Sequence, residues 1–156
     1  MYDNGYGSPV NRELAFFWYK KSAEQGNLIA QYNVYYCYDK GEGTPMDKQK
    51  GVFWLKKSTE QGYAKAQYHL STKYYQGDLL PMDKEKAFEL LKKSAENHYL
   101  RAQSDLAWKY HLADTSQINN ELAFKWIKKG AEQRYNNAKE QLILAYYYDS
   151  GKGTAV

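Results

Sequence analysis

Residues 23–38 read AEQGNLIAQYNVYYCY, a stretch that ends one predicted helix at a glycine and begins another. The chain repeats this stretch three more times with substitutions. The glutamates at its second position lie 36 residues apart, at Glu24, Glu60, Glu96 and Glu132. A constant period of about 20–50 residues is typical of a stacked repeat array.

Each unit contains two predicted helices. In the first helix, positions four residues apart are apolar and form one face. The residues at these positions are Ala30, Val34 and Tyr38, then Ala66, Leu70 and Tyr74, then Ala102, Leu106 and Tyr110, and finally Ala138, Leu142 and Tyr146. The second helix has a broader apolar stripe that can pack against two neighbours. One position of that stripe holds Trp18, Trp54, Leu90 and Trp126. We predict that Trp54 is buried between helices.

Capping residues set the predicted helix ends. Side chains that can cap a helix N-terminus precede each second helix; they are Asn11, Asp47, Asp83 and Asn119. Gly26 and Gly62 favour a left-handed residue after two of these helices, whereas His98 and Arg134 replace glycine in the other two. The predicted helices span 11–25, 28–40, 47–61, 64–76, 83–97, 100–112, 119–133 and 136–149. The predicted fold is all-α, a right-handed α/α superhelical solenoid of about four 36-residue helix-turn-helix repeats.

The repeat frame predicts one domain over residues 1–156. Its parts are a half unit 1–26, full units 27–62, 63–98 and 99–134, and a half unit 135–156. Half units leave stacking surfaces uncovered, which repeat arrays normally cap. We therefore expect a longer array, a covering partner, or self-association through the uncapped ends.

The order of residues from Ala30 to Gly62 resembles the repeat of the Sel-one-like repeat (SLR) family. The resemblance includes the turn glycines, Trp54 and the closing Glu60-Gln61-Gly62. The resemblance covers essentially the whole chain and implies a tetratricopeptide-like solenoid with a concave, protein-binding surface. Members serve as adaptors and scaffolds, often in bacteria. Two departures stand out. Tyr35 and Ile143 occupy a position where the family usually has a small residue, so we expect their helix pairs to be pushed apart or reoriented. Residues 113–117 also lack the turn glycines and proline.

Composition limits the classes of function. The chain has 22 Lys and Arg against 18 Asp and Glu, a net charge of +4, with the charges interleaved. Nucleic-acid binders usually carry a basic stripe, so no nucleic-acid partner is predicted. No apolar run is long enough to span a membrane, and the N-terminal residues lack the features of a signal peptide. Location stays open: the cytoplasm is favoured, with the periplasm or secretion as alternatives for a fragment.

The sequence contains no recognisable catalytic arrangement. His69, His98 and His111 lack the spacing of metal ligands, and the lone Cys37 cannot form an internal disulfide. We predict no enzyme activity, no metal and no cofactor. The lysine pairs that end the second helices, beginning with Lys20 and Lys21, fit the helix dipole better than an anion-binding ladder. His69 and Asp105 share equivalent neighbouring positions and are expected to approach each other.

A candidate binding face lies on the first helices, opposite their apolar stripe. Its positions change from unit to unit and combine aromatic with polar side chains, as recognition sites do. The predicted partner-binding residues are Tyr32, Asn33, Tyr36, Tyr68, His69, Thr72, Arg101, Asp105 and Trp108. A second exposed feature is predicted on the second helices, where one position holds Phe17, Phe53, Glu89 and Lys125. The two charges indicate that this position faces water.

These observations predict a protein–protein interaction module, an adaptor or scaffold that binds a protein or peptide on its concave face. Two alternatives remain open at this level. One is a dedicated inhibitor or immunity-type protein that clamps an enzyme. The other is an envelope protein that binds glycan or peptidoglycan through its aromatic residues.

Overall fold

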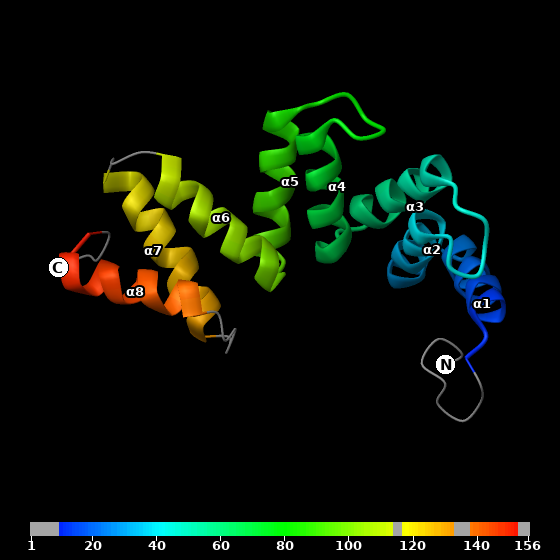
Figure 1. Cartoon of the computed structure of the whole chain (residues 1–156), viewed down its shortest axis with the longest axis horizontal. Coiled ribbons are helices and arrows are strands. Elements are labelled where there is room, and N and C mark those ends of the chain that lie inside the picture. The colour runs from blue at the N-terminus through cyan, green and yellow to red at the C-terminus, as the bar shows by residue number, and fades with distance from the viewer. Residues whose placement is uncertain (1–9, 114–116, 133–137, 153–156) are drawn as a thin grey trace. The chain divides into compact units, whose positions relative to one another are not determined.

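The computed structural model describes residues 10–113, 117–132 and 138–152. Within these ranges the chain forms eight helices and no strand, which confirms the predicted all-α class (Figure 1). The helices are α1 (Arg12–Glu24), α2 (Leu28–Lys40), α3 (Lys48–Glu60), α4 (Ala64–Gln76), α5 (Lys84–Glu96), α6 (Leu100–Ala113), α7 (Gln117–Glu132) and α8 (Ala138–Ser150). The first six match the predicted ranges within one residue at each end.

Three of the four predicted N-caps are confirmed. The carboxamide or carboxylate oxygen of Asn11, Asp47 and Asp83 accepts a 2.9 Å hydrogen bond from a backbone N–H three residues later. Each bond satisfies one of the free N–H groups of the first turn. Asn119 was predicted wrongly, because α7 begins at Gln117 and contains it. The preceding turn lacks the proline found in the other turns, so the backbone restriction that proline imposes is absent there.

The second helices end in one recurring turn. Gly26 and Gly62 have φ values of 94° and 86°, as predicted. His98 occupies the same position with φ 64°, although it is not glycine. All three turns close with a backbone hydrogen bond to a carbonyl three residues earlier. Arg134 lies outside the described residues.

The chain divides into two compact units, residues 1–90 and 91–156. In the first unit α2 packs against both α1 and α3, and α4 packs against α3 (Figure 1). Its core combines the Ala/Val/Tyr face of α2, Trp54 and Leu55 of α3, and the Ala/Leu/Tyr face of α4. Trp54 is 9% exposed, as predicted.

Tyr35 does not push α2 and α3 apart. It is buried, and its ring lies against Gly51 of α3, where an added Cβ would be 3.5 Å from the ring and 3.3 Å from the Tyr35 carbonyl oxygen. The other second helices carry alanine at the position of Gly51. The large residue on one helix is therefore matched by the smallest residue on its neighbour, which maintains close packing.

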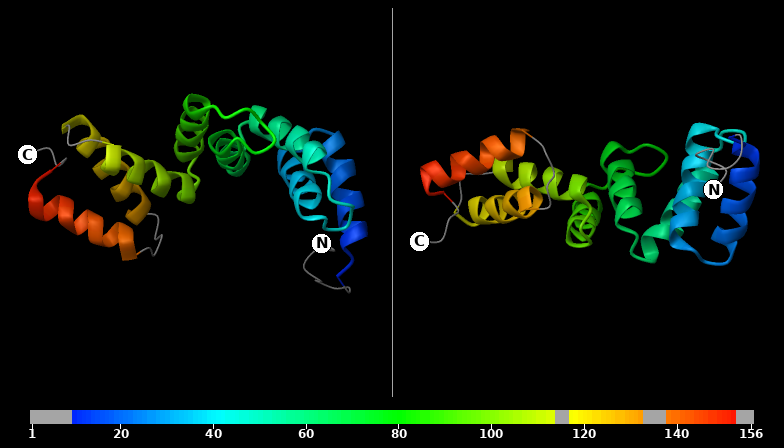
Figure 2. Two further views of the ribbon diagram at one scale, coloured as in Figure 1. Left: turned by 45° about the horizontal axis from the view of Figure 1, so that its top comes forward. Right: turned by 90° about the horizontal axis from the view of Figure 1, so that it is seen from below.

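In the second unit α7 packs against α6 and α8 (Figure 2). The predicted stripe of α6 is buried at Ala102 and Leu106. The predicted stripe of α8 is wrong, because Leu142 and Tyr146 are exposed and Tyr147 is buried instead. The Tyr147 ring packs against His111 and Phe124. In α8 the side chain that faces α6 and α7 is Tyr147, which contacts His111 of α6 and Phe124 of α7, whereas Leu142 and Tyr146 lie largely in solvent.

Candidate protein-binding faces

In the first compact unit, residues 1–90, the first helices of neighbouring repeats meet through an aromatic cluster. The Tyr32 ring of α2 lies 5.5 Å from Tyr63 and 5.4 Å from His69 of α4, measured between ring centroids. The Lys65 ammonium lies 4.9 Å from the Tyr32 centroid. Tyr32 is only 4% exposed, so the expectation that its ring is exposed is wrong. His69 of the following first helix packs on the Tyr32 ring, and a role of Tyr32 in partner binding stays a prediction.

The remaining predicted residues of unit 1 lie around this cluster. Tyr36 is 41% exposed, whereas Asn33, Tyr68, His69 and Thr72 are half-buried. His69 packs against Tyr68, and the Thr72 hydroxyl donates a 2.7 Å hydrogen bond to the His69 carbonyl oxygen. Aromatic rings held by such packing lose little conformational freedom when a partner binds. We call these five residues, together with Tyr32 beneath them, the α2–α4 face.

A charged network borders the α2–α4 face. The Lys73 ammonium lies 3.5 Å from Asp39 and 2.8 Å from Asp78, and its side chain is 12% exposed. Burial opposes ionisation of Asp39, but the Lys40 hydrogen bond and the Lys73 charge outweigh it and lower the pKa of that carboxyl. Burial, reinforced by the two carboxylates, raises the pKa of Tyr35. This network holds α2 and α4 together beside the aromatic cluster.

In unit 2 the predicted residues lie on α6. Arg101 is exposed, and Asp105 and Trp108 are half-buried. The Trp108 ring meets His111 edge-on at 5.7 Å. His111 Nδ1 lies 2.9 Å from the Tyr147 hydroxyl, within hydrogen-bond distance. Trp108 therefore sits in a polar-aromatic cluster that joins α6 to α8. The expected approach of His69 to Asp105 stays a prediction.

Sequence reasoning missed one position of the first helices. Three residues beyond Tyr36, Thr72, Trp108 and Leu144, the first helices carry Asp39, Tyr75, His111 and Tyr147. Residues three apart on a helix are neighbours, so this position lies beside the predicted face, although Tyr147 is buried. Tyr75 is 51% exposed. The signal was present in the repeat frame, as a position that changes between charged and aromatic residues.

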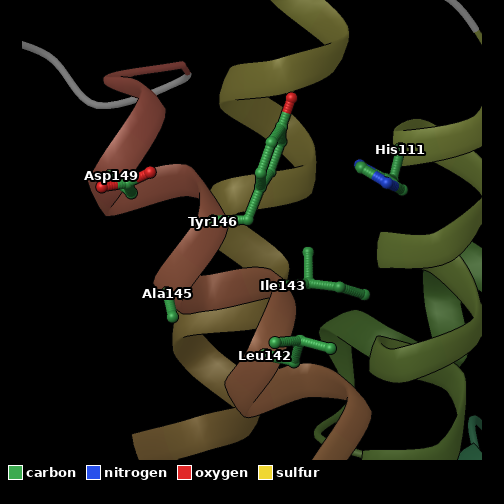
Figure 3. A pocket seen from close by; sticks show the side chains of 6 residues that line it. All are labelled: His111, Leu142, Ile143, Ala145, Tyr146 and Asp149. Atoms are coloured by element: carbon green, nitrogen blue, oxygen red, sulfur yellow. The ribbon is translucent and has the colours of Figure 1, made fainter.

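A hollow of about 810 Å³ lies between α6 and α8 (Figure 3). Figure 3 shows His111 extending from α6 toward α8, which contributes the other lining residues. They are Leu142, Ile143, Ala145, Tyr146 and Asp149. The hollow is open, and its lining is chiefly apolar with a histidine and a carboxylate. Such a surface suits an apolar side chain of a partner.

The predicted water-facing position on the second helices is confirmed. Phe17 and Phe53 are 46% and 53% exposed, and Glu89 and Lys125 are exposed as well. The Lys57 ammonium lies 4.8 Å from the Phe53 centroid, a cation–π contact. Lys21 lies at the same distance from Phe17. These lysines cover aromatic rings. The sequence analysis explained them by the helix dipole alone and did not predict this contact.

Two kinds of feature are absent from the residues that the structure describes. No group of three or more His, Cys, Asp or Glu side chains in that part of the chain could hold a metal ion. No helix in the same ranges is long and apolar enough to cross a membrane.

Comparison with known proteins defines the class of this helical repeat protein. The sequence model of the Sel1 repeat family matches residues 1–27, 28–63, 64–99 and 100–135. The chain therefore belongs to the Sel1 repeat family. A search of curated proteins gives no match.

Two solved structures are similar to this chain. A Sel1 repeat protein from Oxalobacter formigenes is 27% identical, with a TM-score of 0.82 over 98% of this chain and 62% of that one. The protein c5321, described as a protective antigen in uropathogenic Escherichia coli with an SLR fold, is 31% identical. Its TM-score is 0.81 over 99% of this chain and 32% of that one. The chain thus spans less than two thirds of either relative. Sel1 repeats form a typical non-catalytic scaffold and are generally protein–protein interaction modules.

Proposed function

We propose that this chain is an adaptor or scaffold module that binds a protein or peptide through the exposed side of its first helices. The observation that carries the proposal is the α2–α4 face, where the exposed Tyr36 and the half-buried Tyr68 and His69 lie on the first helices and His69 packs on the buried ring of Tyr32. Binding energy in protein interfaces concentrates in a few aromatic and arginine side chains. The α6 residues Arg101 and Trp108 supply the same chemistry in the second unit.

The α2–α4 face is suited to a polypeptide because it combines anchors with hydrogen-bonding groups. Tyr36 and Tyr68 offer ring surface and hydroxyl groups, and Asn33 offers an amide that can pair with a peptide backbone. His69 packs between Tyr32 and Tyr68 and so helps to hold the Tyr68 ring in place. No feature of the described surface favours a glycan or one particular enzyme as the ligand.

The proposal is tested with peptides selected by display against the whole chain, whose affinity is then measured by fluorescence anisotropy. Tyr36→Ala, Tyr68→Ala and Trp108→Ala should each weaken binding by about 1–4 kcal/mol. Tyr68 and Trp108 are half-buried, so their thermal midpoints are measured in parallel and affinities are compared well below them. Tyr36 is the cleanest probe because it is the most exposed of the three.

Phe53→Ala is the matched control, because Phe53 is an aromatic residue on a second helix that is at least as exposed as Tyr36. It should leave affinity within about twofold, since most residues outside a hot spot contribute little. Loss of binding in Phe53→Ala, with normal binding in all three first-helix variants, would move the site to the second helices and overturn the proposal.

A further inference from the structure

The second helices α1 and α3 each expose a phenylalanine at the same repeat position. Phe17 is 46% exposed and Phe53 is 53% exposed. Because α3 packs against both α2 and α4, the exposure of Phe53 does not come from a missing neighbour. The repeat does not require an aromatic ring at this position either, since the equivalent residues of α5 and α7 are the exposed Glu89 and Lys125. The two rings therefore form a surface feature that the packing of the helices does not explain.

A lysine one turn later lies over each of these rings. In α3 the Lys57 ammonium lies 4.8 Å from the centroid of Phe53 and 5.3 Å from that of Trp54. The two rings meet edge-on at 5.5 Å, so the buried indole supports the exposed phenyl ring. In α1 the Lys21 ammonium lies at the same 4.8 Å from the Phe17 centroid. We call Phe17 with Lys21, and Phe53 with Lys57, the two Phe–Lys pairs.

The lysines of the two Phe–Lys pairs are exposed cations that make no ion pair within the part of the chain that the structure describes. Other exposed lysines differ, because Lys20, Lys40 and Lys50 each pair with a nearby carboxylate of this chain. An ammonium over an aromatic ring keeps its full charge, and the ring leaves apolar surface beside it. Each pair therefore suits a ligand that places a carboxylate next to an apolar group.

We propose that the two Phe–Lys pairs form a docking surface for an acidic peptide segment, with carboxylates on the lysines and apolar side chains on the phenylalanines. The occupant is acidic because both cations lack a carboxylate partner among the described residues, so its charge complements theirs. Its length follows from the helices, since α1 and α3 both pack on α2. Packed helices lie about 8–10 Å apart, so the axes of α1 and α3 are at most about 20 Å apart. An extended peptide covers that distance in about six residues.

A peptide fits this surface better than a continuous anionic surface does. Glu24 and Glu60 are exposed and lie three residues after the two lysines, on the same side of their helices. Their charges repel the sheet of negative charge that an anionic bilayer presents, whereas a peptide can place separate carboxylates at the lysines alone. The docking surface is distinct from the α2–α4 face, because it lies on second helices and shares no residue with that face.

The test measures, by fluorescence anisotropy, how the whole chain binds a labelled peptide probe. The probe carries two clusters, each a phenylalanine between two glutamates, joined by a flexible spacer of about six residues. Wild type should bind the probe, and added salt should weaken binding because salt screens the exposed charges. Lys21→Gln combined with Lys57→Gln should weaken binding by about tenfold, since charge-assisted contacts are lost. Phe17→Ala combined with Phe53→Ala should also weaken it, by about tenfold, because the apolar anchors lose their surface.

Lys20→Gln combined with Lys56→Gln is the matched control, because it removes the same charge one residue earlier in the same helices. This control and Tyr36→Ala should bind the probe within about twofold of wild type, and circular dichroism should report unchanged helix content in every variant.

Three outcomes would overturn the proposal. Wild type fails to bind the probe, or the Lys21 and Lys57 variant loses no more affinity than the lysine control, which would show general charge attraction. The third is tighter binding of wild type to phosphatidylserine vesicles than to the probe, lost in the Lys21 and Lys57 variant, which would assign the surface to a membrane.

Discussion

At the scale of single residues, the Asp39 carboxylate is largely buried and forms ion pairs with two lysines. Its ion pair with Lys40 measures 3.0 Å and the one with Lys73 measures 3.5 Å. Its carboxylate is stabilised in the folded chain, so its pKa lies below the usual value of about 3.9. A depressed folded-state pKa gives stability that is present above the unfolded pKa and is lost as pH falls through the folded pKa.

Asp39→Asn should therefore lower stability near neutral pH and weaken its dependence on pH in the acid range. The measurement is the urea midpoint at several pH values from neutral to below about pH 3, under the unfolded Asp value. Wild type should lose more stability than Asp39→Asn as the pH falls below about 4. Glu89→Gln, at an exposed position on α5, is the control and should keep the wild-type profile. If the urea midpoints of wild type and Asp39→Asn fall in parallel as the pH is lowered, the stabilising role of the Asp39 carboxylate is contradicted.

At the scale of an element, the turn after α5 repeats a glycine turn without its glycine. His98 has φ 64° and keeps the same closing hydrogen bond as Gly26 and Gly62. The left-handed conformation costs a residue with a Cβ about 1–2 kcal/mol. Tertiary packing of the two helices on either side therefore imposes a conformation that the local residue does not favour.

His98→Gly should accordingly raise the free energy of unfolding by about 1 kcal/mol. Gly62→Ala is the reverse control and should lower it by a similar amount, because nothing lies within 4 Å of an added Cβ there and the effect is purely one of backbone conformation. Both changes are read from the midpoint of denaturant unfolding. A His98→Gly variant no more stable than wild type would mean that the exposed imidazole makes compensating contacts.

At the scale of the whole molecule, each of the two compact units has its own contacts between successive helices. Trp54 belongs to the core cluster of the first compact unit, residues 1–90. Trp54→Ala should lower the free energy of unfolding by about 3–5 kcal/mol. In a repeat protein each unit depends mainly on its nearest neighbours. Trp54→Ala should therefore increase amide hydrogen exchange in α2, α3 and α4 more than in α7 and α8.

Phe53→Ala provides the comparison within the same turn of α3. Phe53 is largely exposed but meets the Trp54 ring edge-on, a contact worth about 0.5–1.5 kcal/mol. Phe53→Ala should lower the free energy of unfolding by no more than that contact energy. It should leave the amide-exchange pattern of residues 1–90 close to that of wild type. A loss under about 1 kcal/mol in Trp54→Ala would contradict the burial of the indole.

The repeat frame predicted which residues form helices and which positions usually form the core. Helical periodicity, caps and turn glycines act over a few residues, and the 36-residue period repeats them, so the first six helices and the family could be predicted without a structure. The burial of Trp54 and the exposure of Phe53 also followed, because equivalent positions in other units carried the same signal.

The burial of residues whose surroundings differ from repeat to repeat could not be predicted without the packed helices. Tyr32 is buried because His69 and Tyr63 of the following repeat cover it, and Tyr35 fits because α3 offers Gly51. Leu142 and Trp18 match the core pattern yet are exposed. Periodicity identifies the face of a helix that can be buried. Whether that face is buried depends on which neighbour is present, and a single helix does not encode its neighbour.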